Sequence, residues 1–230
     1  MKTVGIVGGI APESTIQYYR LIIAGYHEHK RDGNYPSILI NSINMKQMLD
    51  LIGAKRLTET IQYLRGEIDK LARAGADFGV LASNTPHLVF DDLQAVSPIP
   101  LISIVRATCQ RADELGLKRV GLFGTRFTMQ GGFYDKEFEK RGMAIVLPAV
   151  DDQDYIHEKY MTELVNGVIL DGTRAGLLRI VNRLKREQKI QGLVLGGTEL
   201  PLILKDGDDP EVPFLDTTSI HVQSIIEALL

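Results

Sequence analysis

"VGIVGG" at residues 4–9 and "VGLFGT" at residues 120–125 decide the fold of this chain. Each is a short apolar run that ends in glycine or threonine and precedes a segment of helical period, as a buried strand turning into a helix does. A second pair repeats at the same offset of about 115 residues, "GVLASNTPHLVF" at 79–90 and "LVLGGTELPLIL" at 193–204. Two matches at one offset favour a tandem duplication that gives two related α/β units.

Short β-branched runs alternate with longer segments of helical period along the whole chain. Strands are predicted at Val4–Val7, Ser37–Asn41, Phe78–Leu81, Leu101–Ile104, Arg119–Phe123, Ala144–Val146, Leu193–Leu195 and Pro213–Leu215. Helices are predicted at Glu13–His29, Thr58–Ala74, Val105–Leu115, Gln130–Lys140, Tyr155–Asn166, Thr173–Glu187 and Ser219–Leu229. Several strands are continuous apolar runs, which predicts mainly parallel sheets covered on both faces, hence an α/β protein.

Two pseudo-symmetric α/β domains follow from this pattern. We expect residues 1–98 plus 212–230 to form the first domain and residues 99–211 the second, because polar, proline-containing stretches lie near both divisions. Ligands of open α/β sheets bind outside the carboxyl ends of the strands. Two units that face each other therefore predict an active site in the cleft between them.

The composition excludes several classes of partner. Hydrophobic residues make up 44% of the 230 residues and charged residues 24%, which is typical of a soluble globular protein. A net charge of −3 gives no reason to expect nucleic acid or an acidic membrane surface. The single cysteine, Cys109, suits a reducing compartment. The apolar stretch at the N-terminus is too short for a signal peptide, and no stretch approaches a membrane span. We expect a cytoplasmic protein without nucleic-acid or membrane partners.

The first glycine-rich turn, "GGIAPEST" at 8–15, joins a predicted strand to a helix. Gly8 and Gly9 permit a tight turn, and Glu13, Ser14 and Thr15 are expected to cap free N–H groups at the helix start. The spacing is a weak match to the dinucleotide-binding fingerprint, and no P-loop lysine follows.

The other strand-end turns are rich in small hydrogen-bonding side chains. "ASNTPH" at 82–87 and its duplicate "GGTE" at 196–199 follow matched strands, and "GTRFTM" at 124–129 follows a third. Asparagine and threonine there can bind a carboxylate together with helix N–H groups. Each turn alone is typical of ordinary turn chemistry, but their symmetric positions favour a pocket for a small carboxylate. Its candidate residues are Ser83, Asn84, Thr85, His87, Thr125, Arg126, Thr128, Thr198 and Glu199.

Two histidine-containing stretches, "HEH" at 27–29 and "HEKYM" at 157–161, are similar to zinc motifs. The second lacks the histidine that the motif needs at position 161. We interpret both as solvated helix faces and expect no metal site. Cys109 lies within a predicted helix, away from every strand end, and is expected in the core or at an interface.

Five motifs together resemble the aspartate/glutamate racemase family: "GIVGGIAPESTIQYYRLI", "ASNTPHLVF", "GLFGTRFTMQGGFY", "LGGTELPLI" and "FLDTTSIH". They occur in the family's order and span nearly the whole chain. The resemblance implies two α/β domains that face each other over a cleft, commonly assembled as homodimers. It also implies inversion at the α-carbon of an acidic amino acid without metal or pyridoxal phosphate.

In that family, two cysteines exchange the α-proton, one from each domain. Their positions correspond to Ser83 and Gly197 in this chain, so the resemblance predicts a divergent member that lacks both thiols. A serine can donate a proton, whereas glycine can neither donate nor accept one. Cys109 cannot substitute, because its helix matches neither turn. Relatives also bind the distal carboxylate with basic side chains, for which Lys46, Arg126 and Lys159 are candidates here.

Three functions stay open at this point. The chain could be a racemase in which Ser83 works with Thr198, Glu199 or a bound water, with His87 nearby. It could instead be a one-sided lyase- or decarboxylase-type enzyme acting on a carboxylate, or a binding protein for a small carboxylate without turnover. In each case the expected ligand-binding residues are Gly8, Gly9, Asn84, Thr85, Thr125, Arg126, Thr128 and Thr198.

Overall fold

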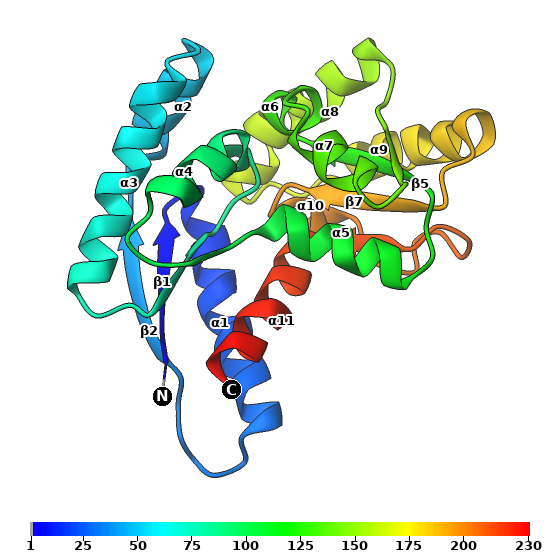
Figure 1. The fold of residues 1–230 in the computed structure, drawn as a ribbon. Coiled ribbons are helices and arrows are strands. Elements are labelled where there is room, and N and C mark those ends of the chain that lie inside the picture. The colour runs from blue at the N-terminus through cyan, green and yellow to red at the C-terminus, as the bar shows by residue number, and fades with distance from the viewer. Residues whose placement is uncertain (1) are drawn as a thin grey trace. The chain divides into compact units, whose positions relative to one another are not determined.

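The computed structural model describes residues 2–230 and divides them into two compact α/β units. The first contains the chain up to Ile104 together with His221–Leu230, and the second contains Val105–Ile220. Figure 1 shows the helices and strands along the chain, coloured from blue at the N-terminus to red at the C-terminus.

The first unit is built on a four-stranded parallel sheet with the order β2-β1-β3-β4. Its strands are β1 (Thr3–Gly8), β2 (Ser37–Ser42), β3 (Phe78–Leu81) and β4 (Leu101–Ile102). Its helices are α1 (Pro12–His29), α2 (Met45–Gly53), α3 (Leu57–Arg73), the 3-10 helix η1 (Thr85–Val89), α4 (Phe90–Val96) and the end of α11 (Thr217–Leu229).

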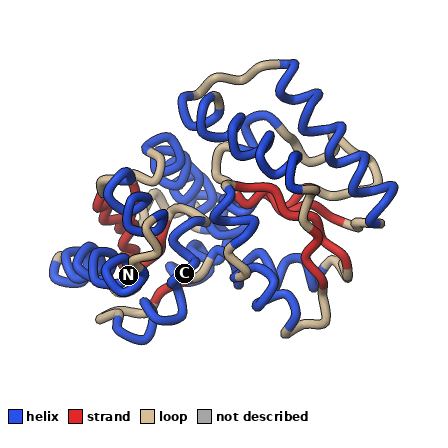
Figure 2. Tube along the Cα trace, turned by 90° about the horizontal axis from the view of Figure 1, so that it is seen from above, coloured by secondary structure: helices blue, strands red, loops and turns tan. Residues whose placement is uncertain are grey.

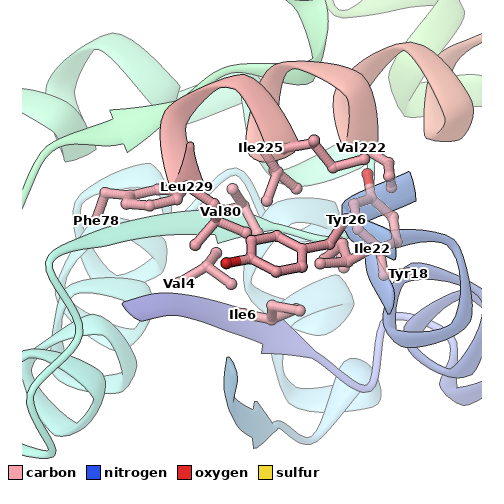
Figure 3. Packing of buried hydrophobic residues seen from close by; sticks show 12 residues of the cluster. Val4, Ile6, Tyr18, Ile22, Tyr26, Phe78, Val80, Val222, Ile225 and Leu229 are labelled. Carbon is pink, nitrogen blue, oxygen red and sulfur yellow. The ribbon is translucent and has the colours of Figure 1, made fainter. Parts of the chain in front are cut away.

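Alternate residues of β1 and β3 pack against α1 and α11 on one face of this sheet. Figure 3 shows Val4, Ile6 and Val80 in contact with the side chains of these two helices, among them Tyr18 and Ile225. The opposite face of β1 carries Gly5, where an added Cβ would lie only 2.9 Å from Ala76 and 3.1 Å from Leu71. The missing side chain lets α3 and the turn after it pack closely on the strand. Both faces are therefore covered, as the apolar runs predict.

The second unit has a parallel sheet with the order β6-β5-β7-β8. Its strands are β5 (Arg119–Gly124), β6 (Ala144–Val146), β7 (Gly192–Gly196) and β8 (Phe214–Asp216). Its helices are α5 (Ile104–Glu114), α6 (Arg126–Gln130), α7 (Phe133–Glu139), α8 (Val150–Thr162), η2 (Leu164–Asn166), α9 (Asp171–Arg183), the π-helical turn η3 (Leu184–Gln188), α10 (Leu200–Ile203) and the start of α11. In Figure 2 the strands (red) lie among surrounding helices (blue).

The two sheets repeat one strand order, with β1, β2, β3 and β4 corresponding to β5, β6, β7 and β8. This correspondence is what a tandem duplication produces, and the fold is the two-sheet α/β class predicted from the sequence. The units divide at residues 104/105 and 220/221, whereas the sequence pattern places the divisions at 98/99 and 211/212. The reason is strand pairing: β4 pairs with β3 and β8 pairs with β7, so each strand stays with its own sheet.

All eight predicted strands are present, with small shifts at their ends. The helix predicted at Gln130–Lys140 is α7, but it begins only at Phe133, because Gly131 and Gly132, the latter with a φ of +71°, separate it from α6. The helices α2, α4, α6 and α10 were not predicted. The expected capping at the start of α1 was wrong, since its N-cap residue is Ala11 and no side chain caps it.

Candidate functional site

The carboxyl ends of β1, β2 and β3 lie at one edge of the first sheet, because these strands are parallel and in register. Gly9 follows β1 with a φ of +80°, and an added Cβ there would lie 2.6 Å from the Ile43 oxygen and 2.7 Å from Ser42 Oγ. Only glycine allows this backbone to lie so close to the end of β2.

The hydroxyls predicted to cap α1 instead connect the strand ends. Thr15 Oγ1 accepts a hydrogen bond of 2.7 Å from the Gly9 N–H. Ser14 Oγ donates to the Ala82 carbonyl over 3.0 Å. These bonds join the turn after β1 to the turn after β3, so the polar segment that begins at Ser83 has a fixed position in the first unit.

Ser83, Asn84 and Thr85 follow β3 and are all buried, with Ser83 8% exposed. They lead directly into η1, where Pro86 occupies the first turn. Small polar side chains at the end of a parallel strand are placed where α/β proteins bind ligands. The structure therefore brings these three predicted residues together at one sheet edge.

His87 has a different environment from these three residues. Its Nδ1–H donates to the Ser83 carbonyl over 3.0 Å, and its Nε2 accepts the Ile104 N–H over 3.3 Å. The ring is buried and stacks on Phe90, with centroids 4.8 Å apart and an interplanar angle of 5°. These contacts use both ring nitrogens of a neutral imidazole, which favours a structural role in holding the Ser83 turn.

In the second unit, the turns after β5 and β7 lie side by side, because Gly124 and Gly196 are partners in the register of those strands. Thr125 is the N-cap of α6, and its side chain accepts the Thr128 N–H over 3.2 Å. The two hydroxyl oxygens are 3.1 Å apart and both residues are buried. The predicted pair of threonines thus forms one compact polar group.

Gly197 follows β7 and has a close neighbour that the sequence did not indicate. A Cβ added at Gly197 would lie 2.4 Å from Cε2, 2.9 Å from Cζ and 3.0 Å from the hydroxyl oxygen of Tyr160. Tyr160 belongs to α8 and is buried. Its ring therefore occupies the space into which a side chain at position 197 would extend.

The Tyr160 hydroxyl donates a short hydrogen bond to Glu199 Oε2, and Thr198 Oγ1 donates to the same oxygen over 2.9 Å. All three residues are at most 6% exposed. Burial raises the pKa of the Tyr160 hydroxyl well above its ordinary value, and the negative charge of Glu199 raises it further. Hydrogen bonding with the Thr198 side chain and the Glu199 backbone acts in the opposite direction but is the weaker influence. The phenol is therefore protonated at neutral pH.

Sequence reasoning missed Tyr160, although one signal was present. The buried residues of α8 are Gln153, Ile156 and Tyr160, which follow helical spacing. That stripe predicts which face of α8 is buried. It does not predict that the tyrosine faces a glycine, because the two residues lie in elements far apart in the sequence.

The basic candidates for a distal carboxylate all have acidic partners. Lys46 is highly exposed, pairs with Asp50 at 2.6 Å and lines an open hollow of about 700 Å³ between α2 and α3. The remaining two belong to the second unit, where Arg126 pairs with Asp154 at 2.8 Å and Lys159 pairs with Glu163 at 2.7 Å. Arg126 directly follows Thr125, and its backbone N–H donates to His157 Nδ1 over 3.2 Å.

Cys109 is buried in α5, which confirms the predicted core position. Its thiol donates to the Glu137 carbonyl over 3.4 Å, and burial raises its pKa to about 11. It is thus a poor acid–base group at neutral pH. Within residues 2–230, no group of three or more histidine, cysteine, aspartate or glutamate residues is arranged to hold a metal ion. Nor does any helix of that range have the length and apolar character of a membrane span.

Comparison with known proteins places this arrangement in a family. A broad specificity amino-acid racemase, RacX of Bacillus subtilis strain 168, is 24% identical over 241 residues, which cover 99% of this chain and 98% of RacX. A crystal structure from Yersinia pestis superposes with a TM-score of 0.91 at 32% identity, and it covers 100% of this chain and 99% of its own. The aspartate racemase homologue PH1733 of Pyrococcus horikoshii OT3 has a TM-score of 0.86 at 34% identity, with coverage of 100% and 99%.

The model of one protein family matches residues 7–225, a range that includes every strand-end turn described above. The chain belongs to the Asp/Glu/Hydantoin racemase family.

Proposed function

We propose that this protein inverts the configuration at the α-carbon of an amino acid, acidic substrates included, without a cofactor. The observation that carries the proposal is the matched pair of strand-end turns in a chain of the racemase family. Ser83, Asn84 and Thr85 follow β3, and Gly197, Thr198 and Glu199 follow its counterpart β7. Each unit thus offers hydroxyl or carboxyl groups at the edge where α/β sheets bind ligands.

The reaction requires one group to remove the α-proton and another to return a proton to the opposite face. The α-C–H bond breaks, its electron pair is delocalised into the substrate carboxylate, and a new C–H bond then forms. A positioned acid or base typically contributes about 10²–10⁴-fold to such a step. In the proposal, Ser83 is the proton-transfer group of the first unit, and Thr198 and Glu199 belong to the second group.

Hydrogen-bond donors around the substrate carboxylate stabilise the charge that develops when the proton leaves. We assign this role to Asn84, Thr85, Thr125, Thr128 and Thr198, with the backbone of Gly8 and Gly9 shaping the first edge. Arg126 is the basic candidate for a distal carboxylate, because it directly follows Thr125 at the end of β5. A homodimer is part of the same proposal and is measured by light scattering after size exclusion.

One observation favours a second candidate. Gly197 has no side chain, and the space beside it is filled by a buried tyrosine whose hydroxyl is protonated at neutral pH. With only Ser83 active, the protein would exchange or remove a group on one face of a carboxylate substrate, as a lyase or decarboxylase does. If neither Ser83 nor a group of the second unit transferred a proton, the protein would bind a small carboxylate without turnover.

Solvent deuterium exchange at the α-carbon separates these functions. Both enantiomers of aspartate, glutamate and several neutral amino acids are incubated in D₂O, and the α-proton signal and optical rotation are followed. The neutral substrates are included because RacX is named as a broad specificity racemase. Exchange with loss of rotation supports inversion, and exchange with retained rotation supports one-sided chemistry. Binding without exchange in any of these amino acids contradicts the proposal.

A further inference from the structure

We infer that Tyr160, held by Glu199, is the proton-transfer residue that the second unit supplies in place of a side chain at position 197. This inference rests on the proposed function and assigns the group that it leaves open. Three features of the second unit support it: the space that the ring fills, the hydrogen bonds of its hydroxyl, and the position of both at the end of β7.

The first feature is space. The phenol ring lies within 2.4 Å of the position that a Cβ on residue 197 would take, and its hydroxyl oxygen lies 3.0 Å from that position. Any side chain at 197 would thus compete with Tyr160 for the same volume. Gly197 and Tyr160 form a complementary pair, in which a helix contributes the functional group that the turn lacks.

The second feature is the hydrogen-bond network of the hydroxyl. Tyr160 donates to Glu199 Oε2, so a carboxylate is positioned to accept the phenolic proton. Thr198 also donates to Glu199 Oε2, which fixes the orientation of the carboxylate. The phenol can therefore pass on its own proton as it receives another.

The third feature is location. Gly197, Thr198 and Glu199 follow β7 as Ser83, Asn84 and Thr85 follow β3, and β7 holds the place in its sheet that β3 holds in the other. A ring that merely filled a core would not need its oxygen at this edge. Here the oxygen lies beside the residue that corresponds to Ser83.

The proposed step is balanced in atoms and charge. The α-C–H bond breaks, its proton binds the Tyr160 oxygen, and the former hydroxyl proton moves to Glu199 Oε2. The electron pair stays on the substrate and is delocalised into its carboxylate. Ser83 then gives its hydroxyl proton to the opposite face of the α-carbon. Water afterwards accepts the proton from Glu199 and returns one to Ser83, and the reverse reaction follows the same path.

The test measures early deuterium incorporation separately for the L and the D enantiomer of a substrate that the wild-type protein exchanges. Tyr160→Phe keeps the ring and removes the hydroxyl. We expect it to slow exchange of one enantiomer by about 10²–10⁴-fold and to affect the other enantiomer much less. Ser83→Ala is expected to show the opposite preference. Tyr155→Phe, on the same helix, is the matched control and should leave both rates unchanged.

Glu199→Gln is the second variant, and it applies also if Tyr160→Phe fails to fold. Glutamine can still accept the hydrogen bond from Tyr160 but cannot take up its proton, so the same enantiomer should lose exchange. Circular dichroism and thermal unfolding establish that each variant is folded. Equal effects on both enantiomers, or no effect, in a folded variant would overturn this inference and leave the proposed function standing. Absence of exchange from the wild-type protein would overturn both.

Discussion

In the first unit, Ser83 follows β3, and its own side chain carries a hydroxyl. In the second unit, Gly197 follows β7, and the ring and hydroxyl of Tyr160 from α8 lie where a side chain at position 197 would extend. The strand order around the two turns is the same. The two units therefore share one strand order but present a hydroxyl beside this turn from different elements.

The buried polar groups of the two units differ in the same way. In the first unit, His87 and His221 bond the backbone through ring nitrogens, and burial lowers the pKa of His221 to about 4. In the second unit, the Tyr160 hydroxyl donates to the side chain of Glu199. The comparison indicates that the histidines stabilise the fold, while the tyrosine–glutamate pair can move a proton.

The largest effect on stability is expected where a ring fills the space of a missing side chain. Tyr160→Ala should lower the free energy of unfolding by about 3–5 kcal/mol, since it empties a buried site as other large-to-alanine core changes do. Ser83→Ala, at the matched turn, removes a single oxygen atom and leaves no large cavity, so it should cost at most about 1 kcal/mol. Urea denaturation measures both values. Similar losses at the two turns would contradict the comparison.

A double-mutant cycle sharpens this prediction. In the wild-type background, Gly197→Cys should cost about 1–3 kcal/mol by overpacking against the Tyr160 ring. In the Tyr160→Ala background the same change should cost little, because the space is empty, and the two substitutions should be strongly non-additive. Gly66→Ala on α3 is the control, since an added Cβ there meets nothing within 4 Å; it should be neutral or stabilising. Additive effects would show that the ring does not occupy the space beside Gly197.

The next effect concerns His221, which ties α11 to the first sheet. Its Nε2–H donates to the Ile102 carbonyl over 3.0 Å, and its Nδ1 lies 2.8 Å from the Tyr18 hydroxyl. Burial lowers the pKa of His221 from 6.5 to about 4. Because the unfolded chain binds a proton more readily, the stabilisation is complete above pH 6.5 and is lost as the pH falls toward 4. The loss over this window is about 3 kcal/mol, at about 1.4 kcal/mol for each pH unit.

Chemical denaturation at several pH values, on wild type and His221→Gln, measures this contribution. The variant should be less stable at pH 7 but should lose less stability between pH 6.5 and 4, since glutamine does not titrate. The carboxylates titrate in both proteins, so the difference between the two curves isolates His221. Parallel curves would show that this histidine titrates alike in the folded and the unfolded chain.

The smallest effect is expected at the turns after β1 and β5. Thr15 accepts a hydrogen bond from Gly9 in the first, whereas Thr125 caps α6 in the second. Thr125→Ala should lower the free energy of unfolding by about 1 kcal/mol through loss of the N-cap, and Thr125→Ser should restore most of it. Thermal unfolding of the two variants checks this order. Equal free energies of unfolding for Thr125→Ser and Thr125→Ala would show that the N-cap hydrogen bond does not stabilise the protein.

The sequence by itself determined the strands, the parallel sheets and the duplication. Period and apolar runs are local properties, so all eight strands could be predicted from their residues alone. Two turn-rich segments were less informative. Gly131 and Gly132 delay the start of α7, and α6 and α10 are only five and four residues long. Such short elements have too few residues to show a period.

Only the tertiary structure decided what the side chains at the strand ends do. Ser14 and Thr15 turn back to the strand ends rather than capping α1, because the ends of β1 and β3 offer them partners. Tyr160 reaches Glu199 across 39 residues of sequence and fills the space beside Gly197. Complementary volume and a hydrogen bond between side chains depend on two elements meeting in space. The pattern along one segment contains no information about the segment that packs against it.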